Sequence, residues 1–316
     1  MYVISQFKTK AIFRELHEHA EKYAHSFSEQ QKKRIRIYIG IILYEMTLIA
    51  QLRGRKLNQQ EELRACYLGI LIPLVDDIND EHKINSLEIH RRFTSKEENG
   101  LPQIAVARYF YEQLLKTLSS KEDFLHIQEL ATAAQDASMR QLESAFLSQD
   151  EIQKITYSKG GYAAQLYAAL LEEPMQDGEK EAHHTLGYSI QLINDMFDVW
   201  KDLQNKQQTL FTNSADWKIE EQAYQSSIQE VFSRFRELGY SADRTEQFLI
   251  RISILCGRGS VCMEQLLALQ TEKGTPIQIH NYARKELICD MEKVRNLWAS
   301  YRFSMEHYKQ YSRSKN

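Results

Sequence analysis

The chain has 316 residues, a formal net charge of −3 and an apolar share of 43%. This near-balanced charge lacks the basic face that nucleic-acid binding requires, so we expect no nucleic-acid partner. Only twelve glycines and four prolines interrupt a composition rich in helix-forming residues, which excludes a strand-rich architecture and predicts an all-α fold.

Hydrophobic repeats of helical period run through almost the whole sequence, and the breaks fall at turn-forming residues such as Gly54, Gly100 and Gly274. No low-complexity linker divides the chain, so we predict one domain over residues 1–316. The predicted helices cover residues 7–26, 29–53, 59–82, 101–119, 122–147, 149–172, 178–206, 217–238, 242–269 and 277–310.

The N-terminus lacks the charged-then-apolar order of a secretory signal. The most apolar stretch, residues 35–52, is interrupted by Arg36 and Glu45, so we interpret it as a buried helix rather than a membrane span. Four cysteines show neither metal-binding spacing nor a disulfide framework, which favours reduced thiols in a cytoplasmic protein. These are Cys66, Cys256, Cys262 and Cys289.

The first informative segment is an acidic run that ends an apolar helix. Asp76 and Asp80 are four residues apart and therefore share one helix face, with Asp77 about 100° around the axis. Like charges at this spacing destabilise a helix unless a cation neutralises them. A hard divalent cation such as Mg²⁺, which prefers carboxylate oxygens, would do so.

A second acidic run lies more than a hundred residues later. Asn194, Asp198 and Asp202 form one stripe over two helical turns, Gln191 extends it backwards, and Asp195 lies beside it. A single run of this kind is typical of a solvated helix end. Two runs, each within an apolar helix, favour a pair of Mg²⁺ sites that neutralise a polyanionic leaving group.

With both runs considered, the sequence resembles the class I isoprenoid synthases, which include trans-prenyltransferases and class I terpene cyclases. The DDxxD motif is complete at residues 76–80. The second run is similar to the prenyltransferase motif GxxxQxxDDxxD but has Asn194 in place of the first aspartate, and this makes it similar to the cyclase NxxxSxxxE triad. The matching positions are Gly187, Gln191, Asp195 and Asp198 for the former, and Asn194, Asp198 and Asp202 for the latter.

Weaker matches surround these motifs, and the resemblance extends from about residue 33 to residue 206. The segment at residues 157–161 resembles a prenyltransferase segment whose lysine, here Lys159, contacts the diphosphate. The basic segment at residues 33–36 resembles the GGKRxRP element without its glycines and proline. It could bind a second diphosphate or form a solvated helix face. The arginine pair expected soon after DDxxD comes several residues late, at residues 91–92.

The resemblance implies an antiparallel helical bundle of the isoprenoid synthase type, with the two acidic helices facing each other at the mouth of an apolar cavity. It also implies three Mg²⁺ ions in the closed complex. The predicted metal ligands are Asp76, Asp80, Asn194, Asp195, Asp198 and Asp202, with Asp77 counted among the catalytic residues.

Several bases could bind the diphosphate oxygens, although each also fits an ordinary exposed base. Arg302 lies in a segment similar to a cyclase C-terminal Arg-Tyr pair. The predicted substrate-binding residues are Lys159, Gln191, Lys201, Lys206, Arg140 and Arg302.

The leading functional hypothesis is a Mg²⁺-dependent terpene synthase that ionises an allylic prenyl diphosphate and cyclises or deprotonates the carbocation. The alternative is a prenyltransferase that joins the cation to a second isoprenoid. A non-catalytic regulatory subunit is the rival from another class, against which the intact aspartates argue. We expect a lipophilic substrate that could bring the protein to membrane surfaces, and homodimerisation is compatible with the sequence.

Overall fold

A computed structural model describes residues 6–23, 25–95, 101–142 and 145–312, and every regular element in these ranges is helical. This result confirms the all-α prediction. Contacts between Cα atoms divide the chain into two compact units, which are described separately here. Unit 1 comprises Met1–Asp136 and Leu166–Pro174, and unit 2 comprises Ala137–Gln165 and Met175–Asn316. The single domain and the isoprenoid synthase type of bundle stay predictions.

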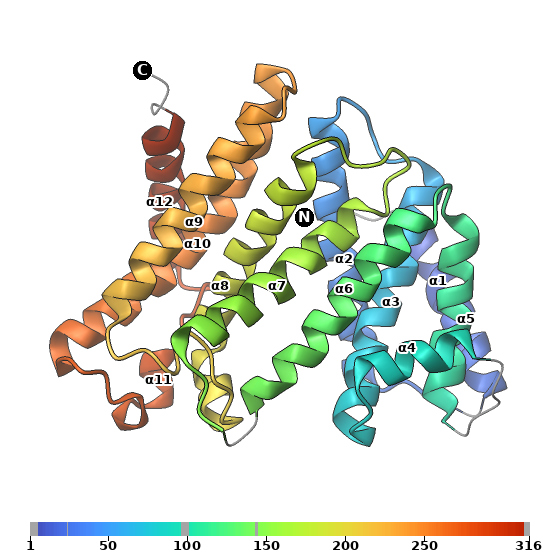
Figure 1. The fold of residues 1–316 in the computed structure, drawn as a ribbon, viewed down its shortest axis with the longest axis horizontal. Coiled ribbons are helices and arrows are strands. Elements are labelled where there is room, and N and C mark those ends of the chain that lie inside the picture. Colours follow the sequence, from blue (N-terminus) through green and yellow to red (C-terminus); the bar gives the residue numbers. More distant parts are fainter. Residues whose placement is uncertain (1–5, 24, 96–100, 143–144, 313–316) are drawn as a thin grey trace. The chain divides into compact units, whose positions relative to one another are not determined.

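Unit 1 is built around one apolar helix, α3, which packs against α2, α4 and α5 (Figure 1). Its buried residues include Leu71, Leu74 and Ile78. The described helices of this unit are α1 (Gln6–Lys22), α2 (Glu29–Leu52), α3 (Gln59–His82), α4 (Ser86–Thr94), α5 (Pro102–Thr117) and most of α6 (Glu122–Ser138).

The starts of α2 and α3 follow from their capping residues. Ser28 forms a capping box with Gln31, and Asn58 forms one with Glu61, so that each cap pairs two backbone N–H groups that would otherwise lack partners. The predicted starts at residues 29 and 59 are therefore confirmed. α3 ends at His82, which places the first acidic run in its last two turns.

One helix of unit 1 is absent from the sequence prediction. α4 begins after Asn85, whose side chain accepts a hydrogen bond from the Glu88 backbone N–H, and it buries Ile89 and Phe93. Nine residues are too few for the helical period to be distinguished from a polar loop. Packing against α3 and α5 therefore decides this element.

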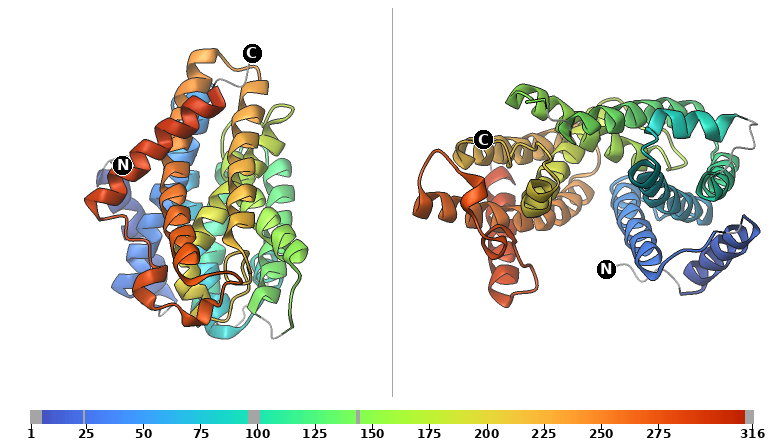
Figure 2. Two further views of the ribbon diagram at one scale, coloured as in Figure 1. Left: turned by 90° about the vertical axis from the view of Figure 1, so that its left-hand side faces the viewer. Right: turned by 90° about the horizontal axis from the view of Figure 1, so that it is seen from below.

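Unit 2 is centred on α10, which packs against α8, α9 and α12 (Figures 1 and 2). Large aromatic residues of α9, including Trp217, Tyr224 and Phe235, are fully buried. The described elements are η1 (Met139–Leu142), α7 (Gln149–Ala168, up to Gln165 in this unit), α8 (Glu179–Gln204), α9 (Trp217–Glu237), α10 (Ala242–Lys273), η2 (Ile279–Asn281), α11 (Arg284–Leu287) and α12 (Val294–Ser312).

Several predicted helices are longer than the observed ones, and two of them differ most. The helix predicted at 277–310 is wrong before residue 294, because residues 277–293 form a loop with two short helical turns. Polar contacts hold this loop on α10, as shown by Gln265 Nε2, which donates to the Glu286 carbonyl oxygen over 2.6 Å. The helix predicted at 122–147 continues only as the 3₁₀ turn η1 after Ser138. At residues 277–293, tertiary contacts outweigh the local helix propensity.

α12 has an unusual distribution of polarity within unit 2. It buries Ser300 and Ser304, whereas Trp298 is 69% exposed and Leu297 is 53% exposed. A Cβ atom on Gly257 of α10 would lie 2.3 Å from Ser304 Oγ. The close approach of α10 and α12 therefore requires small side chains on the buried face.

Two helices, α2 and α10, are long and apolar enough to cross a membrane by length and composition alone. Buried core helices meet the same criterion, and 56% of the most apolar window of each is buried. In α2, residues such as Ile35, Ile39 and Ile42 are fully buried, in agreement with the predicted core role of this helix.

Candidate functional site

Both acidic runs lie at the C-terminal ends of long helices. Asp76 and Asp80 lie in the last two turns of α3, and Asp198 and Asp202 lie in the last two turns of α8. Carboxylates in the last turn, here Asp80 and Asp202, oppose the helix dipole, an effect of about 0.3–1 kcal/mol for each charge. Folding alone thus disfavours these aspartates, and each cluster needs a positive partner.

In unit 1 that partner is Arg34 of α2. Its guanidinium forms an ion pair with Asp77, and its Nη2 lies 3.5 Å from Asp76 Oδ2. Gln31 Nε2 donates a second hydrogen bond to Asp77 Oδ2 over 2.9 Å. Asp77 therefore anchors α3 to α2, whereas Asp80 is exposed at the helix end. This division supports Asp76 and Asp80, rather than Asp77, as the ligand pair.

Arg34 is the residue that the sequence prediction left without a definite role. Of the basic segment at residues 33–36, Lys33 is exposed, and Arg36 stacks on the Phe13 ring at 4.7 Å. The sequence did contain a signal for this pairing. The connection between α2 and α3, residues 53–58, is short, and helices joined by a short loop run antiparallel. The start of α2 then lies beside the end of α3, which pairs Arg34 with the aspartates.

An apolar helix face begins next to this acidic cluster. Ile37, Ile41 and Tyr44 follow Arg34 at helical spacing on α2 and are 42–49% exposed. Glu45 lies beside them, is only 9% exposed, and its Oε1 atom has no hydrogen-bond partner. Burial raises the pKa of Glu45 to about 8. Along α2, unit 1 thus has charged side chains near Arg34, followed by exposed apolar side chains.

In unit 2 the acidic stripe of α8 is crowded. Burial, repulsion by Asp195 and repulsion by Asp198 raise the pKa of Asp202 to about 7, against weaker opposing effects of Lys201 and Lys159. Burial also raises the pKa of Asp195 to about 6, although Gln191 Nε2 donates to its Oδ1 over 2.8 Å. Burial, together with repulsion between neighbouring carboxylates, thus disfavours the charged forms of these two aspartates.

The remaining members of the stripe face solvent. Asn194 is exposed, and Asp198 is half-exposed, with Lys201 Nζ 3.3 Å from its Oδ2. The predicted spacing of Asn194, Asp198 and Asp202 therefore holds on one continuous helix. Asp195, predicted beside the stripe, is buried and bonded to Gln191.

The segment around Lys159 is held against α8 by a contact between two glycines. A Cβ on Gly160 would lie 2.3 Å from the Gly187 carbonyl oxygen, and a Cβ on Gly187 would lie 2.1 Å from the Gly160 carbonyl oxygen. α7 and α8 therefore cross with their backbones almost in contact. This crossing brings Lys159 close enough to lower the pKa of Asp195 and Asp202, although burial has the larger effect on both.

We expect Gly187→Ala to lower the free energy of unfolding by about 3 kcal/mol, because the new methyl group must push α7 away from α8. Gly40→Ala in α2 is the matched control, since a Cβ there meets no atom within 4 Å. That change should stabilise the protein by roughly 0.5–1 kcal/mol, because alanine is the better helix former. Urea unfolding followed by circular dichroism measures both values. Equal effects of the two substitutions would contradict the close crossing.

The other predicted bases lie away from the acidic stripe or have other partners. Arg140 pairs with Glu151 at 3.0 Å, and Arg302 pairs with Glu264 at 3.2 Å. Lys206 is exposed just beyond the end of α8, with a φ angle of 55°. Lys159 and Lys201 are therefore the predicted bases that the described part of unit 2 places near the carboxylates.

A Mg²⁺ ion fits the chemistry of these residues. Among the described residues, no three His, Cys, Asp or Glu side chains converge into a ready-made metal cage. Mg²⁺ does not require one, because it commonly binds one or two carboxylates together with water and substrate phosphates. The excess carboxylate charge around Asp202 is an environment that such an ion would relieve.

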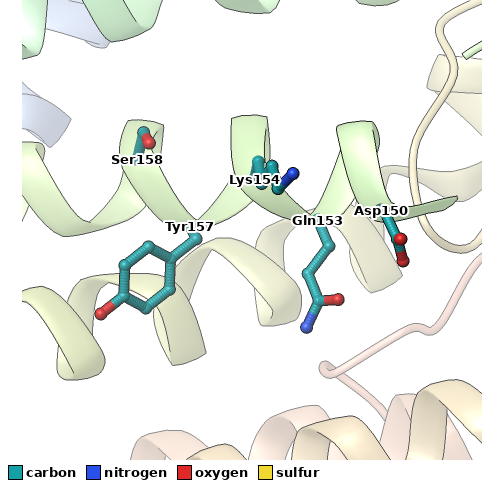
Figure 3. A pocket seen from close by; sticks show the side chains of 5 residues that line it. All are labelled: Asp150, Gln153, Lys154, Tyr157 and Ser158. Atoms are coloured by element: carbon teal, nitrogen blue, oxygen red, sulfur yellow. The ribbon is translucent and has the colours of Figure 1, made fainter. Parts of the chain in front are cut away.

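A shallow surface pocket lies along α7 (Figure 3). It contains none of the predicted site residues, although Ser158 of its lining directly precedes Lys159. Its lining consists of Asp150, Gln153, Lys154, Tyr157 and Ser158.

Comparisons with protein-family models, with curated proteins and with solved structures yield no match for this chain.

Proposed function

We propose that this protein is a Mg²⁺-dependent class I terpene synthase, which ionises an allylic prenyl diphosphate and cyclises or deprotonates the resulting carbocation. The proposed metal ligands are Asp76 and Asp80 in unit 1 and Asn194, Asp198 and Asp202 in unit 2. Asp195 is removed from this set, because its Oδ1 already accepts a hydrogen bond from Gln191 Nε2.

The crowding of carboxylates at the end of α8 is the observation that carries the proposal. Three aspartates lie within the last three turns of α8, and the pKa of Asp202 rises to about 7, first through burial and then through repulsion by its neighbours. Binding of a cation together with a polyanion would offset this repulsion, because the cation neutralises the carboxylates and carries the phosphate oxygens.

In the proposed reaction the allylic C–O bond breaks heterolytically, and the diphosphate leaves with the electron pair. When bound, Mg²⁺ supplies positive charge that stabilises the departing diphosphate. Lys159 adds positive charge beside the α8 carboxylates. The apolar face formed by Ile37, Ile41 and Tyr44 is suited to contact with the hydrocarbon chain. The cation then loses a proton to yield an alkene.

A prenyltransferase is the second candidate, and the hydrogen bond between Gln191 and Asp195 favours it. This bond joins two positions that match the prenyltransferase motif and not the cyclase triad. In this reaction the double bond of a second isoprenoid attacks the cation, and the adduct loses a proton.

The deciding experiment supplies purified protein and Mg²⁺ with geranyl, farnesyl or geranylgeranyl diphosphate, with and without isopentenyl diphosphate. Mass spectrometry of the organic and aqueous phases identifies the products. We expect a hydrocarbon or alcohol from one allylic diphosphate alone. A longer diphosphate formed only with isopentenyl diphosphate would establish the prenyltransferase instead.

A binding measurement separates both enzymes from a non-catalytic helical protein. Inorganic diphosphate with Mg²⁺ should raise the melting temperature, because a ligand that binds only the native state stabilises it. Omission of Mg²⁺ should remove the shift. No shift at saturating ligand, together with no product, would reject both enzymatic proposals.

A further inference from the structure

Along its middle turns, the last helix of unit 2, α12, buries small polar side chains and exposes large apolar ones. Ser300 and Ser304 are buried against α10, where Gly257 leaves room for them. His307 is also buried, and its Nε2 atom forms a hydrogen bond of 2.7 Å with Ser260 Oγ. A surface helix of a globular protein normally turns its apolar side inward. The contact between α10 and the middle of α12 therefore does not explain the apolar residues on the opposite side of α12.

Large apolar side chains form a stripe on this outer side of α12, which lies at the edge of unit 2 (Figure 2). The apolar stripe consists of Val294, Trp298, Tyr301 and Met305. These residues follow one another at intervals of three or four, which places them on one helix face. They are 37–69% exposed, and the neighbouring Leu297 is 53% exposed. Single exposed apolar residues are common on soluble proteins, whereas a continuous stripe points to an interaction surface.

A row of bases runs along one flank of the apolar stripe. Arg295, Arg302 and Lys309 are seven residues apart and exposed, so they lie on one side of α12 and form a basic row. Arg302 is paired with Glu264 at 3.2 Å and with Glu306 at 3.7 Å. Exposed ion pairs of this kind are weak, so Arg302 can exchange these partners for other anions. The surface of α12 therefore combines an apolar stripe with a positively charged flank.

An anionic lipid bilayer is the partner whose chemistry matches both features. A helix that lies in the membrane interface buries its apolar face at the boundary between headgroups and acyl chains, while its bases contact anionic headgroups. Tryptophan and tyrosine are enriched at this depth, because their rings are apolar and their N–H or O–H groups stay hydrated. A second copy of the chain matches less well. In an antiparallel twofold pairing across the apolar stripe, the same flank of each helix would meet, which brings bases against bases.

We propose that α12 is an interfacial helix that binds this protein to the surface of an anionic lipid bilayer. The apolar stripe enters the boundary between headgroups and acyl chains, and the basic row contacts the anionic headgroups. The helix lies in the plane of the interface and does not span the bilayer, because its buried side stays packed on α10. Such binding requires neither Mg²⁺ nor a diphosphate, so it does not rest on the proposed reaction.

The test mixes the full-length protein, without Mg²⁺ or substrate, with sedimentable vesicles of phosphatidylcholine alone or of phosphatidylcholine with phosphatidylserine. We expect binding to the anionic vesicles to be at least about tenfold stronger than binding to the neutral ones. Added salt should weaken it, because salt screens the attraction between the basic row and the headgroups. Equal binding to both kinds of vesicle, or binding to neither, would overturn the proposal.

Substitutions in the apolar stripe decide whether α12 is the part that binds. Trp298→Ala should weaken binding to the anionic vesicles by about tenfold, because it removes a large apolar ring from the contact. Phe146→Ala is the matched control, since Phe146 lies outside α12 and is 83% exposed, and it should bind like the wild type. Acyl-brominated phosphatidylcholine in the anionic vesicles should quench tryptophan fluorescence in the wild type. Trp298→Phe should lose most of this quenching, because Trp217 is fully buried and Trp200 is half-buried. Equal binding of the two alanine variants would exclude α12.

Substitutions in the basic row test the contribution of charge. Arg295→Gln combined with Lys309→Gln should weaken binding to the anionic vesicles roughly 30-fold. Lys116→Gln combined with Lys121→Gln removes the same charge at exposed positions of unit 1 and should leave binding unchanged. Thermal unfolding checks that each variant is folded. Sedimentation velocity without vesicles tests the second copy as the partner: a wild-type dimer that Trp298→Ala dissociates would assign this face to self-association and overturn the proposal. None of these outcomes depends on enzymatic turnover.

Discussion

Replacement of Asp198 by alanine should lower turnover of an allylic diphosphate by about 1,000-fold while the helical fold remains intact. Asp198 is the middle residue of the acidic stripe on α8, and its side chain is 49% exposed. In the proposed enzyme it offers an oxygen to Mg²⁺, and removal of one group that stabilises the leaving charge commonly costs two to three orders of magnitude, roughly 3–4 kcal/mol in activation free energy.

The same substitution should leave the protein without Mg²⁺ at least as stable as the wild type. Asp198 raises the pKa of both Asp195 and Asp202 by like-charge repulsion, after the larger effect of burial, so its removal relieves strain at the helix end. Loss of activity without loss of stability is typical of a residue that serves function rather than folding. Diphosphate release gives the turnover, and thermal unfolding without Mg²⁺ gives the stability.

Glu181→Ala is the matched control, since Glu181 is an exposed acid at the opposite end of α8. It should retain wild-type turnover and the thermal shift produced by Mg²⁺ with diphosphate. If Asp198→Ala kept more than about a tenth of the wild-type turnover, the metal assignment on α8 would be rejected. A parallel loss of activity in both variants would instead point to a general defect in α8.

The wild-type protein should lose roughly 3 kcal/mol of stability between about pH 5 and pH 8 relative to Glu45→Gln. Burial raises the pKa of Glu45 from 4.5 to about 8, because its environment disfavours the charged form. Across this interval the unfolded chain has released the proton that the folded state still holds. The contribution of Glu45 is therefore fully present below its unfolded pKa and decreases as the pH rises toward the folded pKa.

Glutamine keeps the shape of the side chain but does not titrate, so Glu45→Gln isolates this contribution. Urea unfolding at several pH values between 5 and 8 measures the difference in slope. Glu112→Gln, at an exposed position on α5, should follow the wild-type curve. Parallel curves for wild type and Glu45→Gln would show that Glu45 reaches water in the folded protein.

Local signals in the sequence are sufficient for most of the helices. Ser28 and Asn58 define the starts of α2 and α3, because their side chains satisfy backbone groups within three residues. The stripe of Asn194, Asp198 and Asp202 needs only helical geometry. These predictions succeed since each depends on neighbours along the chain. Residues 277–293 are the exception. Their sequence pattern predicts a helix, but contacts with α10 hold them as a loop.

The sequence by itself determined the all-α class, the positions of the long helices and the location of both acidic runs, since periodicity and capping are properties of nearby residues. Only the tertiary structure decided that Arg34 binds Asp77 and that Gly160 and Gly187 bring α7 against α8. Each of these contacts joins residues on different elements. Their formation depends on how closely two helices pack, and side-chain volume at the crossing determines that distance.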